Sequence, residues 1–196
     1  MDSDGIDNCG LWFGIYASGK LIFLVPNVNS KTWLSFGFYY LLFLFSPPMN
    51  FEFKYFSELT LEELYNILRL RAEIFVVEQD CVYNDIDGLD KNAIHQFATK
   101  EDEIVAYSRL LKPGTRFTDY SIGRVVVKES ERGTGLGIKM MEEAKLFILN
   151  EWQAGKIKIS AQKYLRKFYE DLGFKIVTQE YLEDGIPHFG MLFEKK

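Results

Sequence analysis

A glycine-rich turn between an apolar run and a helical pattern is the feature that most constrains the fold: SIGRVVVKESERGTGLGIKMMEEAKLF, residues 121–147. The run 121–127 is rich in valine and predicts a strand, whereas 137–150 carries apolar residues at helical spacing. A strand that ends in a glycine-rich turn aims several backbone N–H groups at one point, and the N-terminus of the following helix adds positive potential. The segment therefore predicts an α/β unit with a seat for a pyrophosphate.

The spacing of Gly133, Gly135 and Gly137 excludes two familiar phosphate-binding loops. G-x-G-x-G differs from the dinucleotide-binding G-x-G-x-x-G, and no Gly-Lys-Ser/Thr follows as in a Walker A loop. Arg132 begins the turn and would add a charge-assisted contact to a phosphate. The glycines alone fit a turn that only packs the helix close to the sheet equally well, so the choice depends on the rest of the chain.

Residues 49–196 predict a mixed α/β fold around one sheet, with the order β-α-β-β-β-α-β-α-β-β. The predicted strands are 51–56, two strands within 95–111 that meet at residues 100–103, 121–127, 157–162, 175–182 and 187–195. The predicted helices are 59–75, 137–150 and 163–174, the last ended by Gly173. Their expected inward residues are Leu61, Leu64, Ile67, Leu68 and Ala72, then Met140, Ala144, Phe147 and Ile148, then Leu165, Phe168 and Leu172.

Residues 1–48 differ from the rest. Their apolar run, Trp33–Phe45, is shorter than the roughly 20 residues that a helix needs to span a bilayer. The acidic start at Asp2, Asp4 and Asp7 is unlike a signal peptide. We interpret 1–48 as an extension outside the native domain, with Met49 as the native start; a membrane-associating anchor and extra covering strands stay open as alternatives.

Composition limits the function classes. Hydrophobic residues make up 47% and charged residues 26%, as in globular proteins. The net charge of −5 argues against a general nucleic-acid footprint, which needs a basic face. Cys9 and Cys81 are too few for a disulfide framework, so we expect a cytoplasmic protein.

The segment Arg132–Gly137 matches the R/Q-x-x-G-x-G/A signature of the GNAT superfamily of N-acetyltransferases, after a valine-rich strand as in that family. The stretch AQKYLRKFYEDLGF, 161–174, resembles the family's strand and helix with a tyrosine before Gly-Phe. Segments 75–90, 122–127 and 181–191 resemble ElaA-type members in the same order. The resemblance covers residues 49–196 and implies the GNAT acyl-CoA N-acyltransferase fold.

The resemblance implies acetyl-CoA as co-substrate and no metal. The cofactor would lie where strands around 125–127 and 158–161 splay apart, with the backbone of Val127 on the pantetheine and that of Val125 polarising the thioester carbonyl. The pyrophosphate would lie on Arg132, Gly133, Thr134, Gly135 and Gly137. Tyr169 is where the family places a phenolic proton donor for the departing thiolate; the alternative is a core aromatic.

The acceptor amine needs a base, and the candidates are Glu78, Asp85, Asp87, His95 and His188. We rank Glu78 first and expect Asp85, Asp87 and His188 to bind the acceptor, because the resemblance places segment 75–90 on the acceptor side, where carboxylates attract a cationic amine. The spacing of the acidic run does not fit a calcium loop. A solvated acidic loop and structural histidines are the alternatives.

Two functions follow from these features. One is an N-acetyltransferase that moves an acetyl group from acetyl-CoA to a primary amine of a small molecule or protein. The other is a non-catalytic acyl-CoA-binding sensor, which needs the glycine turn but not Tyr169. A membrane-tethered interaction protein rests on residues 1–48 alone, no nucleic-acid partner is expected, and a homodimer is left open.

Overall fold

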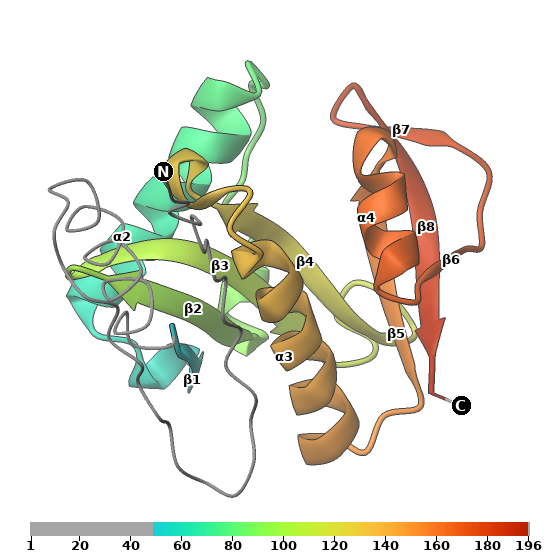
Figure 1. Ribbon diagram of the computed structural model, residues 1–196, viewed down its shortest axis with the longest axis horizontal. Helices are drawn as coiled ribbons and strands as arrows, with labels where there is room; N and C mark the ends of the chain where they lie inside the picture. Colours follow the sequence, from blue (N-terminus) through green and yellow to red (C-terminus); the bar gives the residue numbers. More distant parts are fainter. Residues whose placement is uncertain (1–48, 196) are drawn as a thin grey trace, which may run out of the picture. The chain divides into compact units, whose positions relative to one another are not determined.

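In the computed structural model, which describes residues 49–195, one mixed sheet carries helices on both faces (Figure 1). Within these residues the strand order is β1-β2-β3-β4-β5-β8-β6, with β7 paired to β8. The strands are β1 Phe51–Tyr55, β2 Ile94–Lys100, β3 Glu103–Leu111, β4 Tyr120–Val127, β5 Lys156–Gln162, β6 Lys175–Ile176, β7 Tyr181–Glu183 and β8 Ile186–Glu194; the helices are α2 Leu61–Ala72, α3 Leu136–Glu151 and α4 Arg166–Asp171.

The helices define two faces of the sheet. On the α2 face, Ile67, Leu70 and Ile74 pack against Phe97, Tyr107 and Val126. On the α3 face, residues of α3 and α4 form one cluster with strand residues: Ile122, Met141, Ala144, Ile148, Ile157, Ile159, Ala161, Tyr169 and Leu172. The α3 and α4 stripes thus follow the predicted periodicity.

Helix α2 begins where the sequence predicts but buries a different stripe. Thr60 caps it, since its hydroxyl accepts from the Glu63 N–H and the Glu63 carboxylate accepts from the Thr60 N–H. The prediction of Leu61 as an inward residue is wrong, because 88% of it is exposed, and Ala72 is exposed too. Arg71 is fully buried instead. A pattern based on apolar residues alone does not predict an arginine at a buried position.

The C-terminal part differs from the prediction in one strand. Segment 175–182 forms two short strands, β6 and β7, rather than one, and between them the Val177 N–H donates to the Gly190 carbonyl. The predicted hairpin at 100–103 is confirmed, with Glu101 and Asp102 at φ 50° and 63° as a two-residue turn requires. No helix within residues 49–195 is long and apolar enough to cross a membrane. The predictions for 1–48, including the Trp33–Phe45 run, lie outside the described residues.

A bulge in β4 decides where the sheet opens. Gly123 pairs with Arg109 and Val126 with Tyr107, so Arg124 and Val125 together oppose Ser108. Arg124 has φ 51°, and the extra residue moves the side chains that face α3 from Ile122 to Val125.

Beyond this point β4 leaves its other neighbour. Strands β4 and β5 are parallel and pair only at Tyr120 with Ile157 and Ser121 with Lys158. Figure 1 shows them side by side at one end and diverging toward the other. The backbone from Gly123 to Val127 therefore has no strand partner on its β5 side.

Candidate functional site

The divergence of β4 and β5 opens a cavity of about 670 Å³. Its walls bring together the glycine turn, the bulged part of β4, the end of β5 and helix α4. The predicted site residues that line it are Glu78, Val125, Val127, Arg132, Gly133, Gly135, Gly137, Tyr169 and His188, whereas Asp85, Asp87, Thr134 and His95 do not.

The glycine turn places two demands on backbone conformation. Gly133 and Gly135 have φ 76° and 86°, the left-handed region that favours glycine. A Cβ on Gly137 would lie 3.6 Å from Cγ2 of Val127, an ordinary van der Waals contact, so space does not require a glycine at this position. No side chain caps α3, and its first turn carries no acidic residue, so positive potential at the N-terminus is not offset locally.

Arg132 and Glu78 form an ion pair beside this turn. The two terminal nitrogens of Arg132 lie 2.8 and 2.7 Å from the two carboxylate oxygens of Glu78, and its Nε donates to the Val127 carbonyl at 3.0 Å. The pairing with Glu78 raises the pKa of Arg132. The Thr134 hydroxyl donates to the Glu131 carbonyl at 2.7 Å, so it shapes the turn rather than facing the cavity. A phosphate at this turn would compete with Glu78 for Arg132.

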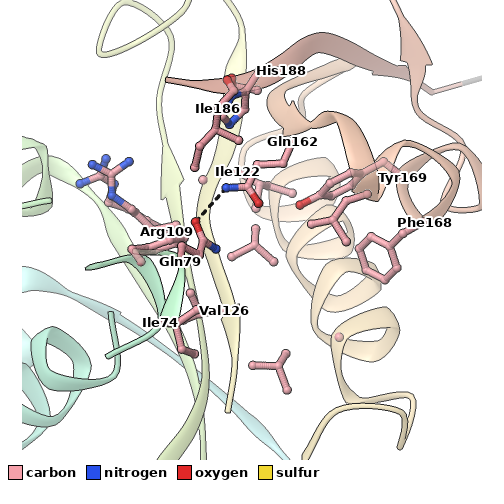
Figure 2. A pocket seen from close by; sticks show the side chains of 18 of the residues that line it. Ile74, Gln79, Arg109, Ile122, Val126, Gln162, Phe168, Tyr169, Ile186 and His188 are labelled. Carbon is pink, nitrogen blue, oxygen red and sulfur yellow. Dashed lines mark hydrogen bonds between the residues drawn. The ribbon is translucent and has the colours of Figure 1, made fainter. Parts of the chain in front are cut away.

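Tyr169 is held by aromatic packing with its hydroxyl toward the cavity. Only 5% of the residue is exposed, and its ring packs edge-on against Phe168 and Phe174 at centroid distances of 5.0 and 6.0 Å. Figure 2 shows the hydroxyl pointing from α4 toward Gln162. Burial raises the pKa of this phenol, and within residues 49–195 the hydroxyl makes no hydrogen bond.

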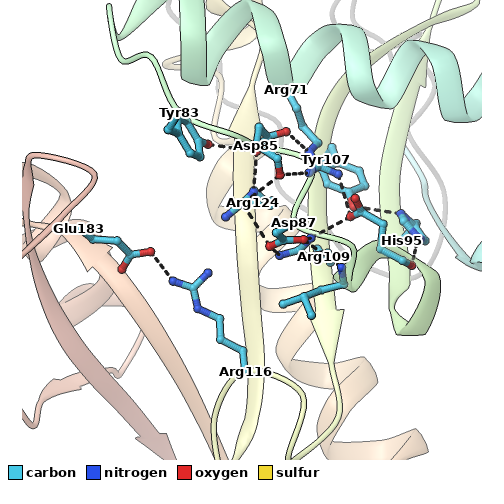
Figure 3. A network of polar contacts seen from close by, with 12 residues as sticks. Arg71, Tyr83, Asp85, Asp87, His95, Tyr107, Arg109, Arg116, Arg124 and Glu183 are labelled. Atoms are coloured by element: carbon cyan, nitrogen blue, oxygen red, sulfur yellow. Dashed lines mark hydrogen bonds and ion pairs between the residues drawn. The ribbon is translucent and has the colours of Figure 1, made fainter.

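The acidic segment after α2 forms a network with arginines on the α2 face (Figure 3). We call it the arginine–aspartate network; it consists of Arg71, Asp85, Asp87, Asp90, Arg109 and Arg124. Arg71 donates to Asp85 and Asp90 at 2.8 Å each, and Arg109 donates to both oxygens of Asp87 at 2.7 and 2.6 Å. Arg124 donates to Asp87 at 3.2 Å.

The network engages the carboxylates that we expected to attract an amine. Burial alone would raise the pKa of Asp87, but hydrogen bonds from Arg109 and the Leu89 N–H outweigh it, and the pKa lies below its ordinary value. The hydrogen bonds of these aspartates join the loop to α2, β3 and β4, so the carboxylates have a structural role. The sequence signal that we missed is arginine at an apolar position, Arg71 on a buried helix face and Arg109 in an apolar strand.

His95 belongs to the core beside this network. It is fully buried, with Nε2 3.0 Å from the Asp90 carbonyl and Nδ1 3.0 Å from the Tyr107 hydroxyl. Burial lowers its pKa. Both ring nitrogens are engaged, so His95 has no free position for a substrate.

A second polar group lies at the cavity and contains, besides the predicted His188, residues that the sequence did not single out. We call it the His188 cluster; it consists of Arg116, Ser160, Tyr181, Glu183 and His188. The Ser160 hydroxyl donates to Glu183 at 2.6 Å, Arg116 also pairs with Glu183, and the hydroxyls of Ser160 and Tyr181 lie 2.5 Å apart. Burial would raise the pKa of Glu183, but the contacts from Ser160 and Arg116 lower it overall. In the described part of the chain no three His, Cys, Asp or Glu side chains are grouped to hold a metal.

This architecture, a parallel strand pair that splits beside a glycine turn and encloses a cavity, defines the class: an acyl-CoA N-acyltransferase fold. The family model described as "Acetyltransferase (GNAT) domain" matches residues 60–195. The chain therefore belongs to the GNAT acetyltransferase family, whose fold binds acyl-CoA, and within it the chain is ElaA-like, which confirms the resemblance seen in the sequence.

Individual relatives support this assignment. The ElaA protein of Escherichia coli K12 is 43% identical over 140 residues, which cover 70% of this chain and 92% of that protein. The crystal structure of an acyl-CoA N-acyltransferase from Pseudomonas aeruginosa has 41% identity and a TM-score of 0.70, covering 74% of this chain and 99% of that one. The crystal structure of E. coli ElaA has 40% identity, the same coverage and the same TM-score.

Proposed function

We propose that residues 49–196 form an N-acetyltransferase domain that transfers the acetyl group of acetyl-CoA to a primary amine. The observation that carries the proposal is one cavity whose walls include both the glycine turn and the Tyr169 hydroxyl. Binding alone requires the first feature, whereas transfer to an amine also requires a proton donor near the leaving sulfur.

The cofactor would extend along the unpaired edge of β4. Its pyrophosphate would lie on the backbone N–H groups of the turn from Gly133 to Gly137, with Arg132 released from Glu78 to pair with it. The pantetheine would pair with the backbone of Val127, which has no strand partner on its β5 side. The Val125 N–H would polarise the thioester carbonyl.

The chemistry would be direct attack. The amine nitrogen bonds to the thioester carbon, the carbon–sulfur bond breaks, and the sulfur takes a proton from Tyr169 as it leaves. The raised pKa of Tyr169 keeps the donor protonated at neutral pH, and no hydrogen bond from another described residue competes for its hydroxyl.

The test is a screen of small amines, polyamines and peptides for release of the CoA thiol from acetyl-CoA, with acetyl-CoA affinity measured by calorimetry on the same preparation. We expect micromolar to millimolar KM values, the usual range for enzymes. Affinity for acetyl-CoA without turnover on any amine would favour the sensor instead. Loss of both binding and turnover in folded protein would overturn both functions.

A further inference from the structure

His188 has one ring nitrogen committed to the fold and one open to the cavity. Its Nδ1 lies 2.8 Å from the Ile186 carbonyl. A carbonyl only accepts, so Nδ1 carries the hydrogen, and the neutral ring presents a lone pair at Nε2. His188 is 8% exposed and lines the cavity, and Nε2 has no hydrogen bond within residues 49–195 (Figure 2).

His188 lies on the opposite face of the sheet from Tyr169. On β5, Ile157, Ile159 and Ala161 face the α3-side cluster that contains Tyr169, so Ser160 and Gln162 face the other way. His188 is the register partner of Gln162, and directly paired residues share a face. The cavity thus has a phenol on the α3 face of the sheet and an imidazole on the α2 face.

The His188 ring stacks on Tyr181 of the β7–β8 hairpin at 6.1 Å. Three segments contribute other polar side chains to the cavity that His188 lines: Glu183 and Asp184 from the hairpin, Arg116 from the β3–β4 loop, and Glu78, Gln79, Cys81 and Tyr83 from the segment after α2. Burial would raise the pKa of Glu183, but the contacts from Ser160 and Arg116 lower it overall, so this carboxylate keeps its charge at neutral pH.

We propose that the α2 side of the cavity, around the His188 cluster, is the subsite for the acceptor, and that His188 Nε2 takes the proton that the acceptor ammonium must lose before it attacks. The proposal rests on the proposed function. One proton passes from the ammonium to Nε2, directly or through a water, and on to solvent. The second amine proton leaves the nitrogen as the amide forms and, directly or through a water, restores the proton that Tyr169 gave to the departing sulfur.

The geometry separates His188 from the other candidate bases. Both nitrogens of His95 are engaged in the core. Glu78 lies beside the glycine turn as the partner of Arg132, and the Glu78→Gln variant tests the carboxylate that a bound pyrophosphate would release. Among the candidate bases of the described chain, His188 combines a fixed tautomer, an open nitrogen and a place on the cavity wall.

The decisive variant is His188→Asn in the full chain, because the amide can still donate to the Ile186 carbonyl but offers no base. We expect kcat/KM to fall about 100-fold or more at neutral pH. We also expect loss of the decline in rate toward acid pH, with acetyl-CoA affinity unchanged. In His188→Ala, added imidazole should restore part of the rate. The matched control, Glu78→Gln, should keep the acid decline.

Three results separate the proposals. A His188→Asn enzyme with wild-type kcat/KM and an unchanged acid decline overturns the role of His188 while the acetyltransferase stands. Disappearance of the acid decline in Glu78→Gln, with retention in His188→Asn, assigns the base to Glu78. Wild-type protein that binds acetyl-CoA and turns over no amine overturns the proposed function, and the role of His188 with it.

Discussion

Figure 3 shows two groups of charged side chains near the same cleft, the arginine–aspartate network and the Arg116–Glu183 pair of the His188 cluster. In the network, Arg71 and Arg109 are fully buried and their donors go to three aspartates. In the His188 cluster, Arg116 and Glu183 have 26% and 29% exposed side chains, and the Nε2 of His188 is unpaired among the described residues. Each group has a ring or guanidinium nitrogen without a hydrogen-bond partner among the described residues, Arg109 Nε in the network, so the two groups differ instead in burial and in access to the cavity.

This difference separates a structural role from a chemical one. Buried charges that the fold pairs with opposite charges resist changes of protonation and of geometry. A polar group that the fold positions at the cavity but leaves partly unsatisfied can take a substrate as its missing partner. We therefore expect substitutions in the network to change stability, and substitutions on the cavity wall to change turnover.

The largest effect is expected at Tyr169. The variant Tyr169→Phe keeps the ring packing but removes the proton donor. Turnover should fall roughly 100- to 10,000-fold, about 3 to 5 kcal/mol of barrier, with acetyl-CoA affinity and thermal stability retained. The measurement is kcat on the amine that the screen identifies. A decrease of only a few-fold would make Tyr169 a core aromatic and weaken the contrast between the two groups.

Next comes Arg71→Met, which leaves Asp85 and Asp90 each short of one buried partner. The free energy of unfolding should fall by about 3 kcal/mol or more, measured by denaturant titration. Arg69→Met is the matched control on the same helix. Because Arg69 is 51% exposed and pairs with Glu103 at the surface, its loss should cost less than about 1 kcal/mol. An equal loss of unfolding free energy in the two variants would show that the buried network stabilises the fold no more than a surface ion pair does.

A smaller effect is expected at Gly135. A Cβ there meets nothing within 4 Å, so Gly135→Ala is disfavoured by its φ of 86° alone. Strain of about 1 to 2 kcal/mol should lower stability or, if the turn relaxes, lower acetyl-CoA affinity by about tenfold. Gly155→Ala is the control, since that glycine also has open space and no left-handed φ. Unchanged affinity and stability in Gly135→Ala would show that the turn does not depend on a glycine at its left-handed position 135.

The network should also respond to acid in a defined direction. The folded-state pKa values of Asp87 and Asp90 lie below their ordinary values, so the stabilisation is present above the unfolded-state pKa. It is lost as pH falls through the folded-state values. The contribution of these aspartates to the free energy of unfolding should stay constant near neutral pH and decrease only at acid pH. The variant Asp87→Asn should flatten that acid dependence; an unaltered curve would show that Asp87 does not contribute.

The smallest effect is expected from removing residues 1–48. If 49–196 is the native domain, this shorter chain should keep its thermal midpoint and its acetyl-CoA affinity within error. Failure of the shortened chain to fold would show that residues 1–48 complete the core.

The sequence predicted local features well because short-range patterns determine them. The glycine turn, the start of helix α2 and the hairpin at residues 100–103 depend on neighbours within a few positions. The roles of the charged residues depend on pairs that are distant in sequence. Arg109 meets Asp87 across 22 residues, and Arg116 meets Glu183 across 67, so no local pattern shows which carboxylates are neutralised. The bulge at Arg124 is equally invisible, because it depends on the register with β3.

The short seam between β4 and β5 has a mechanical consequence. Only two register pairs join the strand group β1–β4 to the group β5–β8, so the sheet is least stiff along the line where the cavity opens. A change in the width of the split disturbs few ladder hydrogen bonds. Side-chain contacts that cross it, Gln79 to Gln162 at 3.0 Å and Cys81 Sγ to the Asp184 carbonyl at 3.4 Å, then limit how far the two groups separate. We therefore expect a few exchangeable side chains, rather than the backbone scaffold, to set the range of acceptor sizes that the proposed subsite admits.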